Sequence, residues 1–430
     1  MLNLIKNSKL GDRLGKLLRS SLWNATANFL VKINFLVLTF FCSQVFAIDD
    51  FGRFAIVLST LMSFQIFASM GLATAAAKFS ALYRDTDRVV PMLSSVTLLL
   101  LFFSCVSALF LYFLGEYISK EILKDESLKV YLEISSVTLL FAALKSLFTG
   151  LLQGIGEYRT ISSSNLKSVL ITIPVFFILA YFFGLIGAVI GLLFIELTFA
   201  LSLLIKSINR QCFYFRFFLI KKINICEVLK FTLPISLSGM LIMPVNWYLL
   251  KEVAVNYSYL EVGAINVLNQ WQAVLVFIPL SIGTVMMPMM TNANEQKNTY
   301  IRMTKIIFLF SFVVVLFYSL AIDWIISLYG SDYNTLISPE LISMFALCVI
   351  IVPLNNQVLN YVLSIGKPNV LMVANIFWCV LTVALFESLI IQDGILTKYF
   401  FVRFISYFVS TALMILVCTK ISRYESKAIG

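Results

Sequence analysis

Long apolar segments, separated by short polar connections, dominate the sequence. A helix needs roughly 20 predominantly apolar residues to cross the hydrocarbon core of a bilayer. Hydropathy predicts twelve such segments, which with their connections account for nearly the whole chain and leave no room for a soluble domain. The sequence therefore predicts an all-α integral membrane protein with about twelve transmembrane helices. The predicted spans are 21–47, 53–78, 89–115, 130–154, 160–182, 185–205, 229–250, 262–290, 303–326, 335–364, 370–391 and 397–419.

Lysines and arginines are distributed unevenly between the two sides of these predicted helices. Counted over connections and termini, 23 lie on the side of the amino terminus and six on the other, while Lys32, Lys145 and Arg403 lie within spans. The positive-inside rule then places both termini in the cytoplasm. The net charge of +10 is spread between apolar segments and forms no single patch. A membrane surface explains this distribution, and nucleic acid is not a predicted partner.

The sequence lacks the patterns on which many enzymes and metal proteins depend. It contains no histidine, and its seven cysteines include no CxxC pair. These absences remove the commonest general base and the usual zinc ligands. There is also no Walker A or hydrolase motif, so energy from ATP would need another chain. We predict no enzymatic activity, no cofactor and no metal site.

The chain aligns with itself at a shift of about 210 residues. At this shift Gly184 falls on Gly394, and slightly larger shifts place Asn34 on Asn246. Because each half has six spans, the halves enter the membrane from the same side and are predicted to be parallel repeats related by an axis along the membrane normal. Their interface is the expected substrate path in transporters built this way. The predicted parts are an N-terminal half (1–205), a basic cytoplasmic connector (206–228) and a C-terminal half (229–430).

Polar side chains within the spans are the best candidates for a binding site. A charge near the bilayer centre costs at least about 2.5–3.5 kcal/mol, so it usually faces a wet cavity or a partner. Residues near span ends have the alternative of snorkelling to the interface, and serine or threonine often only joins neighbouring helices. The candidate substrate-binding residues are Lys32, Lys145, Arg53, Asn28, Asn246, Asn355 and Arg403.

Glu196 is the deepest acid within the predicted spans. One interpretation is a proton or sodium site that couples transport to an ion gradient. The other is a buried salt bridge to a lysine or to Arg403. The sequence leaves both open.

Several features resemble one family of transporters. A basic amino terminus precedes an asparagine-rich first helix, Phe51-Gly-Arg-Phe enters the second span, and Gln153-Gly-Ile-Gly-Glu-Tyr closes the fourth. The full length resembles a polysaccharide flippase of the MOP superfamily, of the O-antigen (Wzx) type, and this resemblance implies a MATE-like fold.

The resemblance also implies a function. The chain would move an undecaprenyl-pyrophosphate-linked oligosaccharide, the O-antigen repeat unit, from the cytoplasmic to the periplasmic leaflet of a bacterial inner membrane by alternating access. Other polysaccharide-assembly membrane proteins would be its partners. The cationic cavity of the family would correspond here to Lys32, Arg53 and Lys145.

Three alternatives compete with this interpretation. Lipid II flippases of the same superfamily generally carry two further spans. Multidrug MATE exporters have twelve spans but favour cationic drugs, whereas the deep charges here are mostly basic. An O-antigen polymerase or ligase would be an enzyme of similar size, but it usually has a large periplasmic loop, and no predicted outward loop here exceeds about 15 residues.

Overall fold

The computed structural model describes residues 9–84, 86–210, 225–286, 296–329, 336, 338–364, 368–389 and 394–428. Within these ranges all regular secondary structure is helical. Lipid offers no hydrogen-bond partner to an open backbone, so apolar segments in a bilayer satisfy their backbone groups within helices. The chain divides into two compact units, Met1–Val45 with Thr60–Ser236 and Phe46–Ser59 with Leu237–Gly430.

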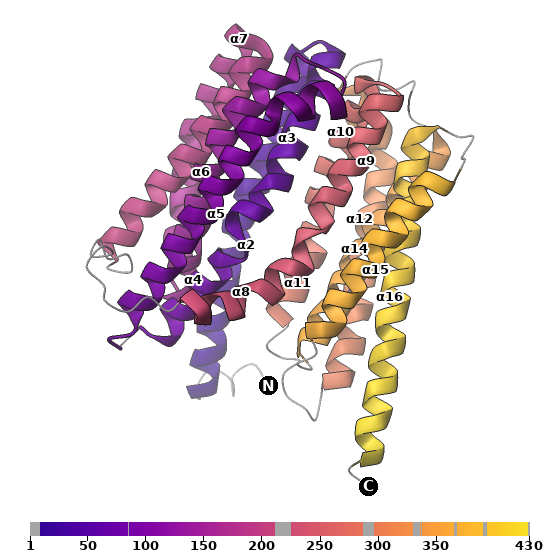
Figure 1. The fold of residues 1–430 in the computed structure, drawn as a ribbon. Coiled ribbons are helices and arrows are strands. Elements are labelled where there is room, and N and C mark those ends of the chain that lie inside the picture. Colours follow the sequence, from indigo (N-terminus) through magenta and orange to yellow (C-terminus); the bar gives the residue numbers. More distant parts are fainter. Residues whose placement is uncertain are drawn as a thin grey trace. The chain divides into compact units, whose positions relative to one another are not determined.

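The first unit has an apolar core to which α4, α5 and α6 contribute most of the buried side chains. Buried Leu72 and Phe79 pack with Met92 and Leu147 in one apolar cluster. In Figure 1, α5, α6 and α7 lie side by side. The helices of this part of the chain are α2 (Lys9–Val45), α3 (Ile48–Ser69, which begins in the second unit), α4 (Leu72–Leu82), α5 (Val89–Tyr117), α6 (Leu128–Gly154), α7 (Tyr158–Asn209) and α8 (Ile225–Met240, which ends in the second unit).

The second unit packs α14 against α16 and α15 against α16 (Figure 1). The start of α3 belongs to this unit, where Gly52 lies so close to Tyr259 that a Cβ atom on the glycine would be 2.1 Å from the tyrosine carbonyl oxygen. The helices that follow α8 are α9 (Ile242–Asn256), α10 (Tyr259–Leu275), α11 (Phe277–Met286), α12 (Gln296–Ser327), α14 (Pro339–Ser364), α15 (Pro368–Ser388) and α16 (Ile395–Ala428).

The prediction of an all-α membrane protein with about twelve transmembrane helices is confirmed. Eight helical segments of the described chain are long and apolar enough to cross a membrane by length and composition. One of them, α7, holds two of the predicted spans, and the first span appears as the shorter apolar segment Phe29–Val45. The seventh and eighth predicted spans are each divided into two shorter helices, α8 with α9 and α10 with α11.

The helix α7 contains 52 residues but folds back on itself at Gly184. A straight helix of that length would extend about 78 Å, far more than the roughly 30 Å hydrocarbon core. Gly184 has φ 58° and ψ −139°, a conformation that glycine adopts most readily. The two arms are antiparallel, since Ser202 Oγ lies 3.1 Å from Ser168 Oγ and 3.3 Å from Ser164 Oγ. Gly394, its partner in the repeat, also has positive φ, at 91°.

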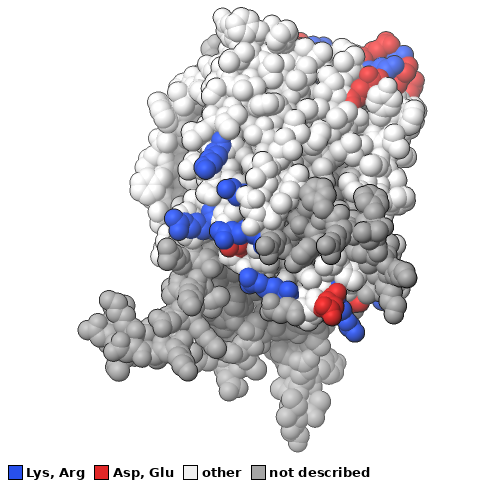
Figure 2. Space-filling model, turned by 90° about the vertical axis from the view of Figure 1, so that its left-hand side faces the viewer, with Lys and Arg blue, Asp and Glu red and all other residues white. Residues whose placement is uncertain are grey.

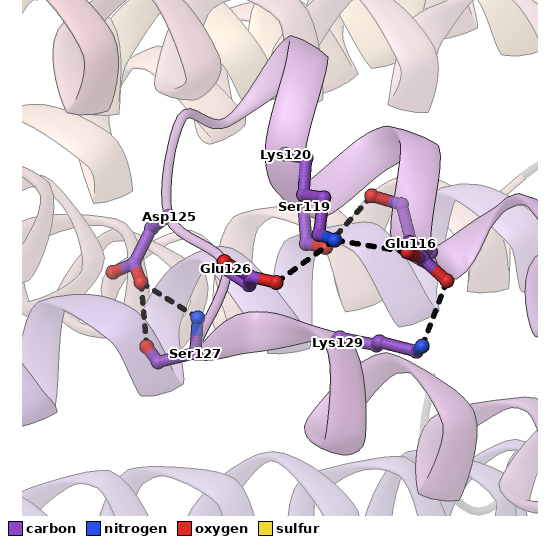
Figure 3. Close-up of polar contacts among 7 residues, drawn as sticks. All are labelled: Glu116, Ser119, Lys120, Asp125, Glu126, Ser127 and Lys129. Atoms are coloured by element: carbon purple, nitrogen blue, oxygen red, sulfur yellow. Dashed lines mark hydrogen bonds and ion pairs between the residues drawn. The ribbon is translucent and has the colours of Figure 1, made fainter.

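The connection between α5 and α6 is held by charged side chains. It contains the π-helix η1 (Ile118–Ile122), and Lys120 Nζ lies 2.9 Å from Glu116 and 2.8 Å from Glu126. Figure 3 shows these contacts together with Lys129, whose Nζ lies 2.7 Å from Glu116. All four side chains are exposed, so each ion pair contributes little alone, but together they fix the connection between two adjacent spans.

Large apolar side chains cover the outer surface of the described helices. Leu320 is 80% exposed, and Phe113 and Phe182 are each more than 70% exposed. Figure 2 shows one face that is largely uncharged, with mainly basic and a few acidic side chains toward its lower end and a mixed acidic and basic group at the upper right. Such a surface is typical of helices that contact lipid acyl chains.

Candidate functional site

Lys145 and Glu196 form a buried ion pair within the first unit. Lys145 comes from the middle of α6, and Glu196 comes from the second arm of α7. The lysine Nζ lies 2.6 Å from both carboxylate oxygens, and the side chains are 20% and 8% exposed. This geometry favours the salt-bridge interpretation of Glu196. An ammonium that is already paired is also a weaker ligand for a second anion.

Lys32 is the other deep cation of the first unit. It lies on α2, which packs along α7, and its side chain is partly buried. Among the described residues Lys32 has no acidic partner. Two residues further along α2, Asn34 is buried, and its Oδ1 accepts no hydrogen bond from the described residues. The side chain of Asn28 lies outside the described part of the structure.

Arg403 is the deep cation of the second unit. It lies on α16, is only 8% exposed, and donates from Nη1 to Asn269 Oδ1 at 2.6 Å and to the Tyr399 hydroxyl at 3.5 Å. These partners are neutral, and no acid of the described chain pairs with the guanidinium. Its Nε has no hydrogen-bond partner among the described residues. The positive charge of Arg403 is therefore held in place but not neutralised.

Neutral groups in the second unit occupy the positions that carry the ion pair in the first. At the shift of 210 residues, Asn355 corresponds to Lys145 and Ser406 to Glu196. Asn355 donates to Thr411 Oγ1 at 2.8 Å instead, and Ser406 is fully buried. The two halves thus share polarity at this depth, but only the first carries the charges.

The remaining predicted residues lie nearer helix ends or bond locally. Arg53 lies in the first turns of α3, where it pairs with Asp50 at 3.0 Å and stacks over the ring of Tyr259 at 5.2 Å. Asn246 donates to the carbonyl of Ile242 on its own helix at 2.8 Å. In the described ranges, no group of three or more Asp, Glu or Cys side chains is placed to hold a metal ion.

Two tyrosines that form hydrogen bonds in the second unit were not among the residues predicted from the sequence. Tyr399 contacts both Asn269 and Arg403, and Tyr329 accepts a hydrogen bond from the Trp271 indole at 3.0 Å. Tyr399 lies one helical turn before Arg403, so the spacing of i and i+4 was a usable signal. Tyr329 had no comparable signal, because its contact joins segments 58 residues apart.

A family model described as "Polysaccharide biosynthesis protein" matches residues 17–294, which is more than half of the chain. The chain belongs to this family. No curated protein matches it in sequence.

Solved structures share its fold. An inward-facing multidrug resistance MATE transporter of the MOP superfamily aligns with a TM-score of 0.73 and 16% identity over 96% of this chain and 99% of the other. An outward-facing structure of such a transporter aligns with 0.70 and 17% identity over 95% and 96%. The MATE transporter ClbM in complex with Rb+ aligns with 0.64 and 17% identity over 96% and 97%. Because the identities are low, these alignments establish the fold alone. The chain has the MATE fold of the MOP superfamily.

Proposed function

We propose that this protein is a flippase that moves an undecaprenyl-pyrophosphate-linked oligosaccharide from the cytoplasmic to the periplasmic leaflet of a bacterial inner membrane. The supporting observation is the family match over residues 17–294 in a chain whose deep cations Lys32 and Arg403 have no acidic partner among the described residues. The family description points to polysaccharide assembly, and the unneutralised charges match a diphosphate.

The chemistry of the substrate explains why such cations are needed. A diphosphate is anionic and cannot cross hydrocarbon unaided, because a charge loses its hydration there. A guanidinium held by neutral partners, as Arg403 is by Asn269 and Tyr399, can replace part of that hydration with charge-assisted hydrogen bonds. Asparagine, serine and tyrosine side chains suit sugar hydroxyls.

Alternating access is the transport mode that the fold supports. MATE transporters of the MOP superfamily have been solved in both inward-facing and outward-facing conformations. We propose that the halves 1–205 and 229–430, joined by the connector 206–228, alternate between conformations that are open to one leaflet and then to the other. Both termini are cytoplasmic in this proposal. Other polysaccharide-assembly membrane proteins would supply and consume the substrate.

Deletion of the gene, followed by analysis of lipid-linked oligosaccharides on each leaflet, tests this function. We expect the intermediate to accumulate on the cytoplasmic leaflet and the wild-type gene to restore its export. In the complemented strain, Lys32→Gln or Arg403→Gln should give export at least about tenfold below that of the wild-type gene. The control Lys305→Gln, which changes an exposed lysine on α12, should export like the wild type. An unchanged leaflet distribution in the deletion strain would exclude the flippase function.

Multidrug export is a second candidate, favoured by the multidrug MATE structures that share the fold. It predicts that deletion raises sensitivity to cationic drugs and leaves lipid-linked oligosaccharides unchanged. Glu196 would be a candidate ion-coupling residue in either transporter, but the proton or sodium would first have to displace Lys145. The leaflet analysis and a drug-sensitivity assay on the same strains separate the two functions.

A further inference from the structure

A polar pocket lies at the open end of the α7 hairpin, away from the Gly184 turn. It has a volume of about 500 Å³ and is formed within the first unit by both arms of the hairpin. The first arm contributes residues from its first two turns, and the second arm contributes residues from its last turn. The lining residues are Arg159, Thr160, Ser163, Lys206, Asn209 and Arg210.

The pocket carries an excess of positive charge. Three of its lining residues are cations, and the adjacent acid is Glu157, which lies 3.4 Å from Arg210 and accepts a hydrogen bond from Thr160 at 2.6 Å. Arg159 stacks over the ring of Trp23 at 5.9 Å, and neither Arg159 nor Lys206 has an acidic partner in the described part of the chain. One acid therefore leaves two cations unneutralised, next to the side-chain amide of Asn209.

The surface beyond the pocket is apolar and faces outward. On the first arm Leu166 and Leu170 are 46% and 67% exposed, and on the second arm Ile205 is 55% exposed. Lys167 is exposed on the same helical face as Arg159 and Ser163, since these positions are four residues apart. A basic, hydroxyl-lined pocket that continues into exposed aliphatic side chains is complementary to a molecule with an anionic head and apolar tails.

The position along the membrane agrees with this chemistry. The open end of the hairpin adjoins the connector 206–228, which the charge asymmetry places in the cytoplasm. Basic pockets between transmembrane helices at the cytoplasmic interface bind anionic lipid head groups.

We propose that this pocket binds the phosphate head group of an anionic phospholipid of the cytoplasmic leaflet. Arg159 and Lys206 contact the phosphate, Asn209 donates to its oxygens, and the acyl chains lie along the exposed aliphatic residues of α7. The site goes beyond the transport function and does not depend on it. Occupation would fix the two arms of α7 against each other at their open end.

Binding of phosphatidylglycerol to the purified full-length protein, measured by native mass spectrometry against phosphatidylcholine, tests the proposal. The test variant is Arg159→Gln/Lys206→Gln. The matched control is Arg84→Gln/Arg88→Gln, which removes two exposed arginines from the connection between α4 and α5. A charge-preserving variant, Arg159→Lys/Lys206→Arg, keeps the pocket cationic. Each near-surface cation contributes enough attraction that losing two should weaken phosphatidylglycerol binding about 30-fold.

We expect the wild type, the control and the charge-preserving variant to retain phosphatidylglycerol in preference to phosphatidylcholine, and the test variant to lose that preference. Equal binding of the two lipids by the wild type would overturn the proposal, as would a test variant that binds like the control. Sodium phosphate added at millimolar concentration should not displace the lipid. If it does, the pocket takes free phosphate and the lipid assignment is wrong. Because binding is read without transport, this result is independent of the flippase function.

Discussion

Removing the carboxylate of Glu196 should destabilise the protein by leaving Lys145 as an unpaired buried charge. The Lys145 side chain is 20% exposed, and the described chain offers no second acid to its Nζ. Breaking a buried ion pair from one side costs about 3–5 kcal/mol, and the remaining exposure of the lysine places Glu196→Gln at the lower end, about 3 kcal/mol. Lys145→Met leaves the more deeply buried carboxylate alone and should cost at least as much.

Removing both charges together should cost much less. Replacing a buried pair by apolar residues of similar size is often neutral or stabilising, so we expect Lys145→Met/Glu196→Leu to stay within about 1 kcal/mol of the wild type. A double-mutant cycle built from Lys145→Met and Glu196→Leu, with the second expected to cost as much as Glu196→Gln, should therefore give a coupling energy of about 5 kcal/mol. Equilibrium unfolding of the purified protein in mixed detergent micelles, followed by the fluorescence of its five tryptophans, measures each value.

The same variants separate the two interpretations of Glu196. If the pair is only structural, the apolar double variant and the charge swap Lys145→Glu/Glu196→Lys should both export substrate. If Glu196 couples transport to an ion, the double variant should fold but fail to export. Single variants that each cost less than about 1 kcal/mol, with no measurable coupling, would refute the reasoning from this ion pair.

Three further predictions concern other parts of the chain. Replacing Lys32 by arginine should retain partial export, because the positive charge is kept although the shape of the side chain changes. If Lys32→Arg exports as little as Lys32→Gln in the leaflet assay, the charge of Lys32 is not what export requires. Gly52→Ala should destabilise the second unit by about 1–3 kcal/mol, because the new Cβ would overlap the Tyr259 carbonyl oxygen; wild-type thermal stability would show that the contact relaxes freely. At the carboxyl terminus, a fused reporter that is active only in the cytoplasm should be active, and one that is active only in the periplasm should not. Activity of the periplasmic reporter would contradict the predicted topology.

The helices could be predicted because hydrophobic length is a direct consequence of the bilayer thickness. The breaks within them could not. The turn at Met70 and Gly71, both with positive φ, divides the second predicted span without a proline, and a glycine in an apolar run gives no distinct signal. Gly184 was different, because two full apolar segments on either side of it required a reversal, and its repeat partner Gly394 marked the same place.

The charged residues of the candidate site could be predicted from the sequence, but their interaction partners could not. Insertion cost identified Lys32, Lys145, Glu196 and Arg403 as residues that need a cavity or a partner. Whether a residue faces a cavity or a partner depends on distances between helices, and nothing in the sequence links Lys145 to Glu196, which is 51 positions away. The neutral cage around Arg403 shows the same limit, since Asn269 lies 134 residues away on α10.

The central claim is most directly tested with the purified protein in liposomes that contain the undecaprenyl-pyrophosphate-linked oligosaccharide. A membrane-impermeant reagent that modifies the sugar reports the fraction of substrate in the outer leaflet over time. We predict that the wild-type protein brings the whole substrate pool to the reagent, whereas protein-free liposomes expose only the outer half. Liposomes with wild-type protein that also expose only the outer half would contradict the flippase account.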